Sequence, residues 1–518
     1  MQNKEILLLR PQNLYGLQNY PPLGLILIGS VLTQAGYGVK ILIGNGRPEF
    51  ARQVAEQAGE ALFVGITATT AEIQDAIALA RALRQRHGHR VPLVWGGWHA
   101  TLFPEQMEKS PLVDFAVLGD GEEGILQIAQ TLSSSRGEAY QENPGEAPGR
   151  KILRTPFVDL NTLPLARYDL LPEIETFITQ PLTDKFQEYY PRALRWLPYQ
   201  SSRGCPYSCA FCINPTTNNR KYRAQNPVKT AQELAEIVTR HRLTHVKIID
   251  DNFFVQIGRV REIFGEVERL GVKFTWDAES RLDYIRPGFM DDAMFNLLKR
   301  NGLVQLTFGI ESGSPDTLKR MRKGYRAGPE YALLAMEMCA KYDLAVRGSF
   351  VLDIPGDSPG DIMETVKLIR RLRRYPKFAC GVHTFRPYPR SPLCDSLLKE
   401  GKFYQPASLE AWSDAAAIRQ FTDTAAERVW QANYTLSSRV SFYESLESGF
   451  WLKPHQLTHP LASWLNRGFM LLAKWRNRQQ FYALPWDKAL YLPFKDFCIR
   501  HLAHKDRLAK GVANQWAS

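Results

Sequence analysis

The chain has 518 residues, of which 44% are hydrophobic and 23% are charged, and its formal net charge is +12 at pH 7. This length predicts two or three domains, and the ordinary composition excludes a fibrous or disordered protein. No apolar run approaches the roughly 20 residues that span a bilayer, and no signal-peptide pattern is present, which favours a cytoplasmic protein.

The excess of basic residues bears on the question of anionic partners. A basic surface attracts the phosphates of nucleic acids without regard to sequence. Here Lys and Arg are spread along the chain, and no nucleic-acid-binding motif accompanies them. We therefore interpret the charge as a solvated basic surface and expect no nucleic-acid partner.

Residues 1–135 alternate short apolar segments with helical stretches, beginning with KEILLLRP and ending near DFAVLGDG. This alternation predicts an α/β fold with a doubly wound, Rossmann-like parallel sheet. Such sheets bind ligands at the carboxyl ends of their strands, so the loops at 67–70 and 95–99 are the expected contacts. Gly96 and Gly97 would let the backbone approach a bulky ligand, although turn glycines of a protein-interaction domain give the same pattern. A polar, Gly- and Pro-rich stretch follows, and we expect a linker over 136–189.

Residues 190–395 contain a second alternation of six strand–helix units, which predicts a partial (β/α)6 barrel of the TIM type. Active residues of such barrels lie at the carboxyl ends of the strands. Acidic and basic residues at the predicted strand ends are therefore expected to face the barrel mouth: Asp250, Asp251, Asp277, Glu279 and Arg281.

Residues 396–518 lose this alternation and predict a helical C-terminal domain. Its aromatic residues, interleaved with Lys and Arg, suit either core packing or a lid over a large apolar or anionic substrate, with peripheral contact at the inner face of a membrane. These aromatics are Phe450, Trp451, Trp464, Phe469, Trp475, Tyr482 and Trp486.

Three of the seven cysteines, Cys205, Cys209 and Cys212, are clustered in a CxxxCxxC spacing directly after a predicted strand. Cytoplasmic thiols stay reduced, so the cluster favours metal binding over a disulfide framework. Three thiolates can bind a 4Fe-4S cluster and leave one iron open. A zinc site is the alternative, but it would normally require a fourth Cys or His at matching spacing.

The segment SSRGCPYSCAFCINP, with Phe211 before the last cysteine, resembles the radical SAM superfamily over roughly residues 195–390. The resemblance implies that S-adenosylmethionine (SAM) binds the open iron and is cleaved to a 5'-deoxyadenosyl radical by one electron. An external donor of the flavodoxin or ferredoxin type would supply that electron. It also implies that Glu311, with Ser312 and Gly313, contacts the SAM amino group. The segment 349–358, with Ser349, Ile354 and Pro355, is implied to be the platform for the adenine.

The N-terminal region resembles the cobalamin-binding domain that precedes the barrel in one large class of this superfamily, through GGWHATLFPEQ and VLGDGEEG. The DxHxxG motif, which supplies a histidine to cobalt in other cobalamin proteins, is absent, because the first strand is followed by RPQNLYG. We therefore predict no lower-ligand histidine. The resemblance implies that Thr67, Gly96 and Gly97 lie near the cobalamin nucleotide tail. Thr69, Gly119 and Glu122 are expected to bind the cofactor as well.

Two enzymatic functions follow from these resemblances. The first is cobalamin-dependent methylation of an unactivated carbon in a large natural-product, tetrapyrrole or lipid-like substrate. The alternative is an oxidative cyclase or ring-rearranging enzyme without methyl transfer, similar to the anaerobic cyclase of chlorophyll synthesis. At the barrel mouth, His383 and Tyr388, with Arg386, are expected to hold a polar substrate group or exchange protons, unless this segment is only a structural loop.

Two further functions share some of these sequence features. A binding protein that responds to cobalamin or to redox state would not need Glu311 and the SAM platform. A methylthiotransferase for transfer RNA would need three more cluster cysteines near the N-terminus, and residues 1–204 contain no cysteine. The second function is therefore excluded.

Overall fold

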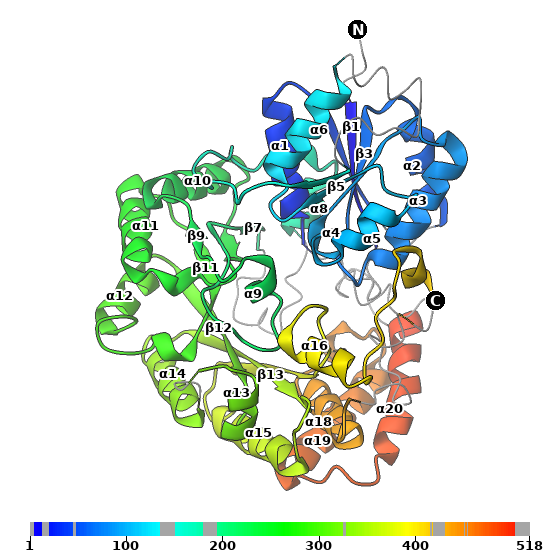
Figure 1. The fold of residues 1–518 in the computed structure, drawn as a ribbon. Helices are drawn as coiled ribbons and strands as arrows, with labels where there is room; N and C mark the ends of the chain where they lie inside the picture. The colour runs from blue at the N-terminus through cyan, green and yellow to red at the C-terminus, as the bar shows by residue number, and fades with distance from the viewer. Residues whose placement is uncertain are drawn as a thin grey trace. The chain divides into compact units, whose positions relative to one another are not determined.

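Figure 1 shows the computed structural model of the chain. It describes residues 5–12, 20–44, 48–134, 151–179, 194–324, 328–414, 417, 430–449, 451–452 and 454–502. The chain forms two compact units. Unit 1 comprises residues 1–177 and 404–423, and unit 2 comprises residues 178–403 and 424–518.

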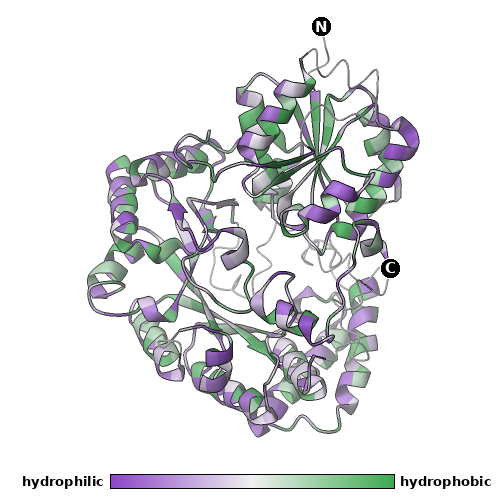
Figure 2. Cartoon of the chain, viewed as in Figure 1, coloured by the Kyte–Doolittle hydropathy of each residue, from purple (hydrophilic) through white to green (hydrophobic). Residues whose placement is uncertain are grey.

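Unit 1 is built on a parallel six-stranded sheet with the strand order β2-β1-β3-β4-β5-β6. Its inner strands are near-continuous apolar runs, as parallel sheets covered on both faces require, and Figure 2 shows them as hydrophobic. The predicted doubly wound sheet is confirmed. The strands are β1 (Glu5–Arg10), β2 (Gly38–Ile43), β3 (Phe63–Thr67), β4 (Leu93–Gly96), β5 (Phe115–Leu118) and β6 (Ile152–Arg154). The helices are α1 (Leu23–Gln34), α2 (Pro48–Gln57), α3 (Ile73–His87), α4 (Gly97–Leu102), α5 (Pro104–Lys109) and α6 (Glu122–Leu132).

The structure differs from the expected linker over 136–189. Strand β6 lies inside that range and pairs in parallel with β5, Ile152 opposite Ala116 and Leu153 opposite Val117. Residues 135–150 and 180–193 lie outside the described residues. The sheet of unit 1 therefore extends past the predicted boundary, because three residues suffice to add an edge strand.

The segment 404–423 also differs from its expected place in a C-terminal domain. Trp412 is fully buried in the core of unit 1 and donates from Nε1 to Gln106 Oε1 (2.9 Å). The amide of Gln106 donates in turn to the carbonyl of Pro406 (2.8 Å). Unit 1 is thus completed by a segment that follows the barrel in the sequence.

Unit 2 is built on a second parallel six-stranded sheet, in the order β14-β13-β12-β11-β10-β7. The sequential order of neighbours and the intervening helices confirm the predicted partial barrel. The strands are β7 (Trp196–Tyr199), β10 (His245–Ile248), β11 (Thr275–Ser280), β12 (Leu303–Glu311), β13 (Ala345–Leu352) and β14 (Phe378–Thr384). The helices of this region are α9 (Asn214–Thr217), α10 (Pro227–Arg240), α11 (Ile257–Leu270), α12 (Asp292–Arg300), α13 (Pro315–Arg320), α14 (Pro329–Lys341), α15 (Pro359–Leu372) and α16 (Pro392–Lys399).

The C-terminal helices belong to unit 2. They are α18 (Tyr434–Glu447), α19 (Pro460–Gln479) and α20 (Trp486–Phe497). Helix α18 packs on the edge strand β14, where Ser441 Oγ donates to the Val382 carbonyl (2.7 Å). Arg373, the residue directly after α15, forms ion pairs with Glu444 and Glu447 of α18. Over the described residues, no helix has the length and apolar character needed to cross a bilayer.

Candidate functional site

The cysteine loop follows β7 and is fixed to the backbone around it. Gly204 has φ +84°, and an added Cβ would lie 2.0 Å from the carbonyl oxygen of Lys221. The backbone N–H of Gly204 donates to Asp251 Oδ2 (2.7 Å). Only glycine fits this position, so Gly204 sets the direction in which the chain enters Cys205.

Asp250 follows β10 and is buried against the segment that leads into the cysteine loop, so its side chain is not open to the barrel mouth as the sequence predicted. Its carboxylate accepts hydrogen bonds from Ser201 N (2.7 Å), Ser201 Oγ (2.8 Å) and Ser202 Oγ (2.5 Å). Burial raises the pKa of Asp250, although these hydrogen bonds and Arg259 act in the opposite direction. The aspartate therefore acts as a buried anchor for the loop.

The three thiols lie half-buried on this loop. Asn252 Nδ2 donates to Cys205 Sγ (3.5 Å), and the backbone N–H of Asn214 donates to Cys212 Sγ (3.4 Å). Burial raises the pKa of Cys205, and it raises that of Cys212 to about 11. Cluster binding requires the thiolate forms, so it would release the protons of the thiols.

The donor set fits an iron–sulfur cluster. Thiolates with N–H donors to sulfur are the ligands that such clusters use. No group of three His, Cys, Asp or Glu side chains that could hold a single metal ion occurs among the described residues. A four-iron cluster does not require such convergence, because each thiolate binds a different iron.

Glu311 ends β12 in a left-handed conformation with φ +66°, at an irregularity in the pairing with β13. Its Oε1 forms an ion pair with Lys323 Nζ at 2.8 Å, and both side chains are largely buried. Burial lowers the pKa of Lys323, but the Glu311 carboxylate outweighs it, so the net shift is upward. An added Cβ at Gly309 would lie 2.4 Å from Glu311 Oε1, so this glycine makes room for the pair.

Ser312 and Gly313, expected as SAM contacts, are held against α15 in this structure. Ser312 Oγ shares a hydrogen bond with Thr365 Oγ1 (2.9 Å), and the backbone N–H of Gly313 donates to the same hydroxyl (2.9 Å). An added Cβ at Gly313 would lie 2.4 Å from the Glu364 carbonyl oxygen. These residues fix the turn that presents Glu311.

The predicted adenine platform follows β13. Ser349 is half-buried on the strand, the Ile354 side chain is buried, and Pro355 is half-buried. Asp357 closes the turn by accepting from the Ile354 backbone N–H (3.0 Å) and by an ion pair with Arg320 (2.6 Å). The segment is therefore a rigid turn at the carboxyl end of β13.

Charged side chains from neighbouring strands interact across the barrel. Asp277 is buried and accepts from His245 Nε2 (2.8 Å) and Lys247 Nζ (2.7 Å), so it does not face the mouth as expected. Glu279, two residues on, remains accessible to water deep within unit 2, with Lys247 and Arg347 in electrostatic contact. Burial raises the pKa of Glu279 against these two cations. Glu279 therefore faces an accessible interior that carries both signs of charge.

The remaining residues expected at the mouth lie in two places. The guanidinium of Arg281 stacks on the Tyr207 ring (3.5 Å) within the cysteine loop and pairs with Asp283 (2.9 Å). His383, the next-to-last residue of β14, has an exposed side chain, and Tyr388 is 57% exposed on the following segment. Arg281 thus joins the cysteine loop, and His383 lies on the opposite edge strand of the sheet. The segment that carries Tyr388 returns to the cysteine loop, where the Leu393 backbone N–H donates to the Ala210 carbonyl (2.9 Å).

In unit 1, Thr67 and Gly97 meet at the carboxyl ends of β3 and β4. Gly97 has φ +83°, and an added Cβ would lie 2.5 Å from Thr67 Oγ1. At Gly96 the nearest atom to such a Cβ is 3.8 Å away. The close approach is therefore made by Gly97, while Gly96 leaves an open backbone surface.

The next loop is tied to this one. Thr101 Oγ1 donates to the Gly97 carbonyl (2.9 Å) and accepts from the Gly119 backbone N–H (3.0 Å). Gly119 has φ +81° with open space beside it, and Glu122 is buried at the start of α6. The predicted residues of both loops therefore line the carboxyl edge of one sheet.

Thr69 is held on the same edge by the loop after β3. Its backbone N–H donates to Glu72 Oε2 (2.8 Å), and Glu72 forms an ion pair with Arg10 (3.2 Å) at the end of β1. His99 lies nearby but is fully buried, with ring contacts to Phe103 (4.8 Å) and Trp412 (5.0 Å). Burial lowers the pKa of His99 to about 3, so this histidine is a neutral core residue.

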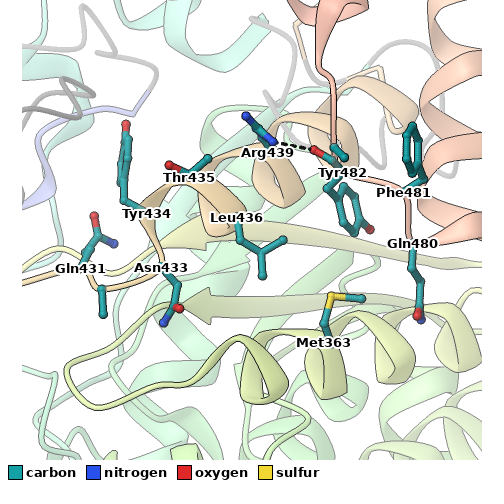
Figure 3. A pocket seen from close by; sticks show the side chains of 12 residues that line it. Met363, Gln431, Asn433, Tyr434, Thr435, Leu436, Arg439, Gln480, Phe481 and Tyr482 are labelled. Atoms are coloured by element: carbon teal, nitrogen blue, oxygen red, sulfur yellow. Dashed lines mark hydrogen bonds between the residues drawn. The ribbon is translucent and has the colours of Figure 1, made fainter.

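A cavity of about 640 Å³ lies elsewhere in unit 2 (Figure 3). The start of α18, Met363 of α15 and the segment 480–483 form its walls, and Arg439 donates to the Tyr482 carbonyl (3.0 Å) across it. None of the predicted cofactor residues lines this cavity.

Family models match both units. The model described as the radical SAM superfamily matches residues 199–369, and the model described as a B12 binding domain matches residues 16–129. The chain is a radical SAM protein with a B12-binding domain.

Relatives of this radical SAM protein include two kinds of enzyme. An uncharacterized methyltransferase of Pyrococcus horikoshii is 26% identical over 385 residues, covering 72% of this chain and 77% of the relative. The anaerobic magnesium-protoporphyrin IX monomethyl ester cyclase of Synechocystis is 24% identical over 356 residues, covering 68% of each chain.

A solved structure has the same fold. It is the radical SAM methyltransferase TsrM from Kitasatospora setae with cobalamin and a [4Fe-4S] cluster bound, and it aligns with a TM-score of 0.59 at 15% identity. The alignment covers 82% of this chain and 83% of that chain.

Three residues of the radical SAM unit were missed by the sequence reasoning. Lys323 pairs with Glu311, Asn252 contacts Cys205, and Asn214 is bonded to both ends of the cysteine loop. The spacing of Asn214, two residues after Cys212, was the one available signal. Lys323 and Asn252 come from other parts of the chain, and no sequence spacing links them to the cysteines.

Proposed function

We propose that this protein is a cobalamin-dependent radical SAM enzyme that methylates an unactivated carbon of a large, lipid-like, tetrapyrrole or natural-product substrate. The observation that carries the proposal is that one chain joins the half-buried three-thiol loop and the Glu311–Lys323 pair to a B12-binding sheet. When bound, the cluster and SAM supply a carbon radical, and cobalamin supplies the methyl group.

The residues of unit 2 would divide the work as follows. Cys205, Cys209 and Cys212 hold the cluster, with Phe211 beside them. Glu311 would orient the SAM amino group, because the ion pair with Lys323 (2.8 Å) fixes one of its two carboxylate oxygens. Ser349 on β13, with Ile354 and Pro355 of the rigid turn that follows, would contact the adenine.

On unit 1, the corrin tail would lie against the carboxyl edge of the sheet. Gly96 offers the open backbone, and Thr67 offers a hydroxyl beside Gly97. At the other end of the barrel sheet, His383 and Tyr388 are proposed to contact the substrate.

The partners follow from this chemistry. An external flavodoxin- or ferredoxin-type protein would deliver the electrons. The enzyme would act in the cytoplasm, in contact with the inner face of a membrane.

The test is anaerobic reconstitution with iron, sulfide and hydroxocobalamin, followed by incubation with SAM and a reductant. We expect 5'-deoxyadenosine, S-adenosylhomocysteine and bound corrin. The Glu311→Gln variant should keep its iron content but lose at least tenfold in 5'-deoxyadenosine formation. Loss of Glu311 without any effect on the SAM products would contradict its assignment.

The second candidate function is cyclisation or ring rearrangement without methyl transfer, which the cyclase relative supports. In that case 5'-deoxyadenosine would form without S-adenosylhomocysteine. If wild type forms no 5'-deoxyadenosine and a Cys209→Ala variant behaves identically, neither enzymatic proposal holds.

A further inference from the structure

Helix α19 buries its polar side and exposes its apolar side, the opposite of an ordinary helix of a globular protein. Its buried residues are small or polar: Ala462, Asn466, Ala473, Arg476 and Asn477. Its exposed residues include five large apolar side chains, at spacings that place them along one side of the helix: Leu461, Trp464, Leu465, Leu471 and Trp475.

Helix α20 repeats the reversal. It buries Asp487, Tyr491 and Lys495. Trp486, Leu490 and Phe497, which recur at helical spacing, are 59%, 59% and 54% exposed. We call the exposed apolar residues of α19 and α20 together the outer apolar surface.

Buried polar contacts hold this arrangement in place. The guanidinium of Arg476 pairs with Asp487 (2.9 Å) and donates to the carbonyls of Phe481, Ala483 and Leu484 (2.9–3.1 Å). A buried arginine satisfied in this way fixes the turn between the helices. The apolar side chains are therefore displayed by a built structure and do not result from loosening of a core.

The two helices present their apolar residues on the same side. They run antiparallel, since Phe469 contacts Tyr491 (5.2 Å) and Phe494 (5.5 Å) while Arg476 meets Asp487. At 3.6 residues per turn, these contacting residues lie about a quarter turn from the exposed apolar residues on both helices. The opposite directions of the helices then turn both apolar sides outward together, in agreement with the exposure of these side chains.

Positive charge borders the outer apolar surface. Arg467, Lys474 and Arg478 are exposed and follow the flank of α19, and α19 contains no Asp or Glu. Tryptophan and leucine beside a basic flank is the pattern of helices that lie in the interface of an anionic bilayer.

We propose that the outer apolar surface is a membrane-docking site that binds bilayers containing anionic phospholipid. Trp464, Leu471, Trp475 and Trp486 enter the boundary between headgroups and acyl chains, and the basic flank contacts the phosphates. This names the surface and the lipid chemistry for the membrane contact suggested above, and it holds whatever reaction the barrel performs.

The test is flotation of the full-length protein with vesicles of phosphatidylcholine alone or with phosphatidylglycerol, without SAM turnover. We expect binding to the anionic vesicles that weakens with salt. Arg467→Gln with Lys474→Gln should weaken it by roughly thirtyfold, which corresponds to about 1 kcal/mol for each basic residue. Lys367→Gln with Lys399→Gln, which removes two exposed lysines elsewhere in unit 2, should have no effect.

The apolar contribution is tested by Trp464→Glu with Leu471→Glu, which should abolish flotation and the blue shift of tryptophan fluorescence on adding vesicles. The control is Val228→Glu with Leu334→Glu. These two apolar residues of unit 2 lie outside the outer apolar surface and are 46% and 42% exposed. Equal flotation of wild type and the Trp464/Leu471 variant would overturn the proposal. Absence of flotation, together with a dimer that this variant converts to a monomer, would assign the surface to a second copy of the chain instead.

Discussion

At the scale of single residues, the cysteine loop depends on one glycine. Gly204→Ala would place a Cβ 2.0 Å from a backbone oxygen at φ +84°. We expect this variant to lose most of its cluster after reconstitution, measured as iron per chain and as absorbance of the cluster. Gly271→Ala is the matched control, because Gly271 also has positive φ (+70°) but open space around it. Equal iron content in both variants would show that the loop can shift.

A second prediction concerns the buried carboxylate of Asp277. Burial opposes its ionisation, but Lys247 and His245 outweigh burial and lower its pKa to about 2. A carboxyl group whose pKa is lower in the folded than in the unfolded chain stabilises the folded state at pH values above its unfolded pKa. This stabilisation is lost as the pH falls towards 2. Asp277→Asn should therefore lower the free energy of unfolding by about 2 kcal/mol at pH 7, and by less at pH 3.

Urea unfolding at the two pH values measures this difference. Glu266→Gln removes the partner of an exposed ion pair with Arg269 and should leave the unfolding midpoint unchanged. A loss for Asp277→Asn that grows as the pH falls would have the wrong sign for this account.

At the scale of elements, the short segment around Trp412 stabilises unit 1. Trp412→Ala removes a fully buried ring that contacts His99 and Phe103, so we expect a loss of roughly 3–5 kcal/mol. Calorimetry should show the unfolding transition of unit 1 at lower temperature. Trp464→Ala removes a side chain that is 69% exposed, so it should leave the unfolding temperatures of both units unchanged. A shift of the transition of unit 2 by Trp412→Ala would contradict the division into units.

Sequence alone predicted most elements of both sheets, because strand–helix alternation is a local signal. It did not predict β6, whose three residues Ile152–Arg154 are too few to show a period. Nor did it place residues 404–423 in unit 1, since that depends on a contact between Trp412 and Gln106, about three hundred residues apart. The same limit explains Asp250 and Asp277. Their places beside predicted strands were visible in the sequence, but the partners that bury their carboxylates come from distant parts of the chain.

At the scale of the whole molecule, the two cores give a separate test of cobalamin binding. A ligand at about 100 times its Kd stabilises the folded state by about 2.7 kcal/mol. Hydroxocobalamin should therefore raise the transition that Trp412→Ala lowers, and Gly97→Ala should abolish this shift because its Cβ would meet Thr67 Oγ1 at 2.5 Å. Gly96→Ala is the control at the neighbouring glycine, because the nearest atom to its added Cβ would be 3.8 Å away. A corrin-induced shift confined to the other transition would place the ligand elsewhere.

The composition of unit 1 from two stretches of chain, 1–177 and 404–423, also has a consequence for biosynthesis. At about 5–20 residues per second, the ribosome needs on the order of 10–50 s after finishing the first stretch before it delivers Trp412. During that interval the nascent sheet exposes the apolar site beside His99 and Phe103 that this ring later fills. Unit 1, which begins to leave the ribosome first, is thus completed only after the barrel has been synthesised. A chaperone could bind its exposed apolar site during that interval.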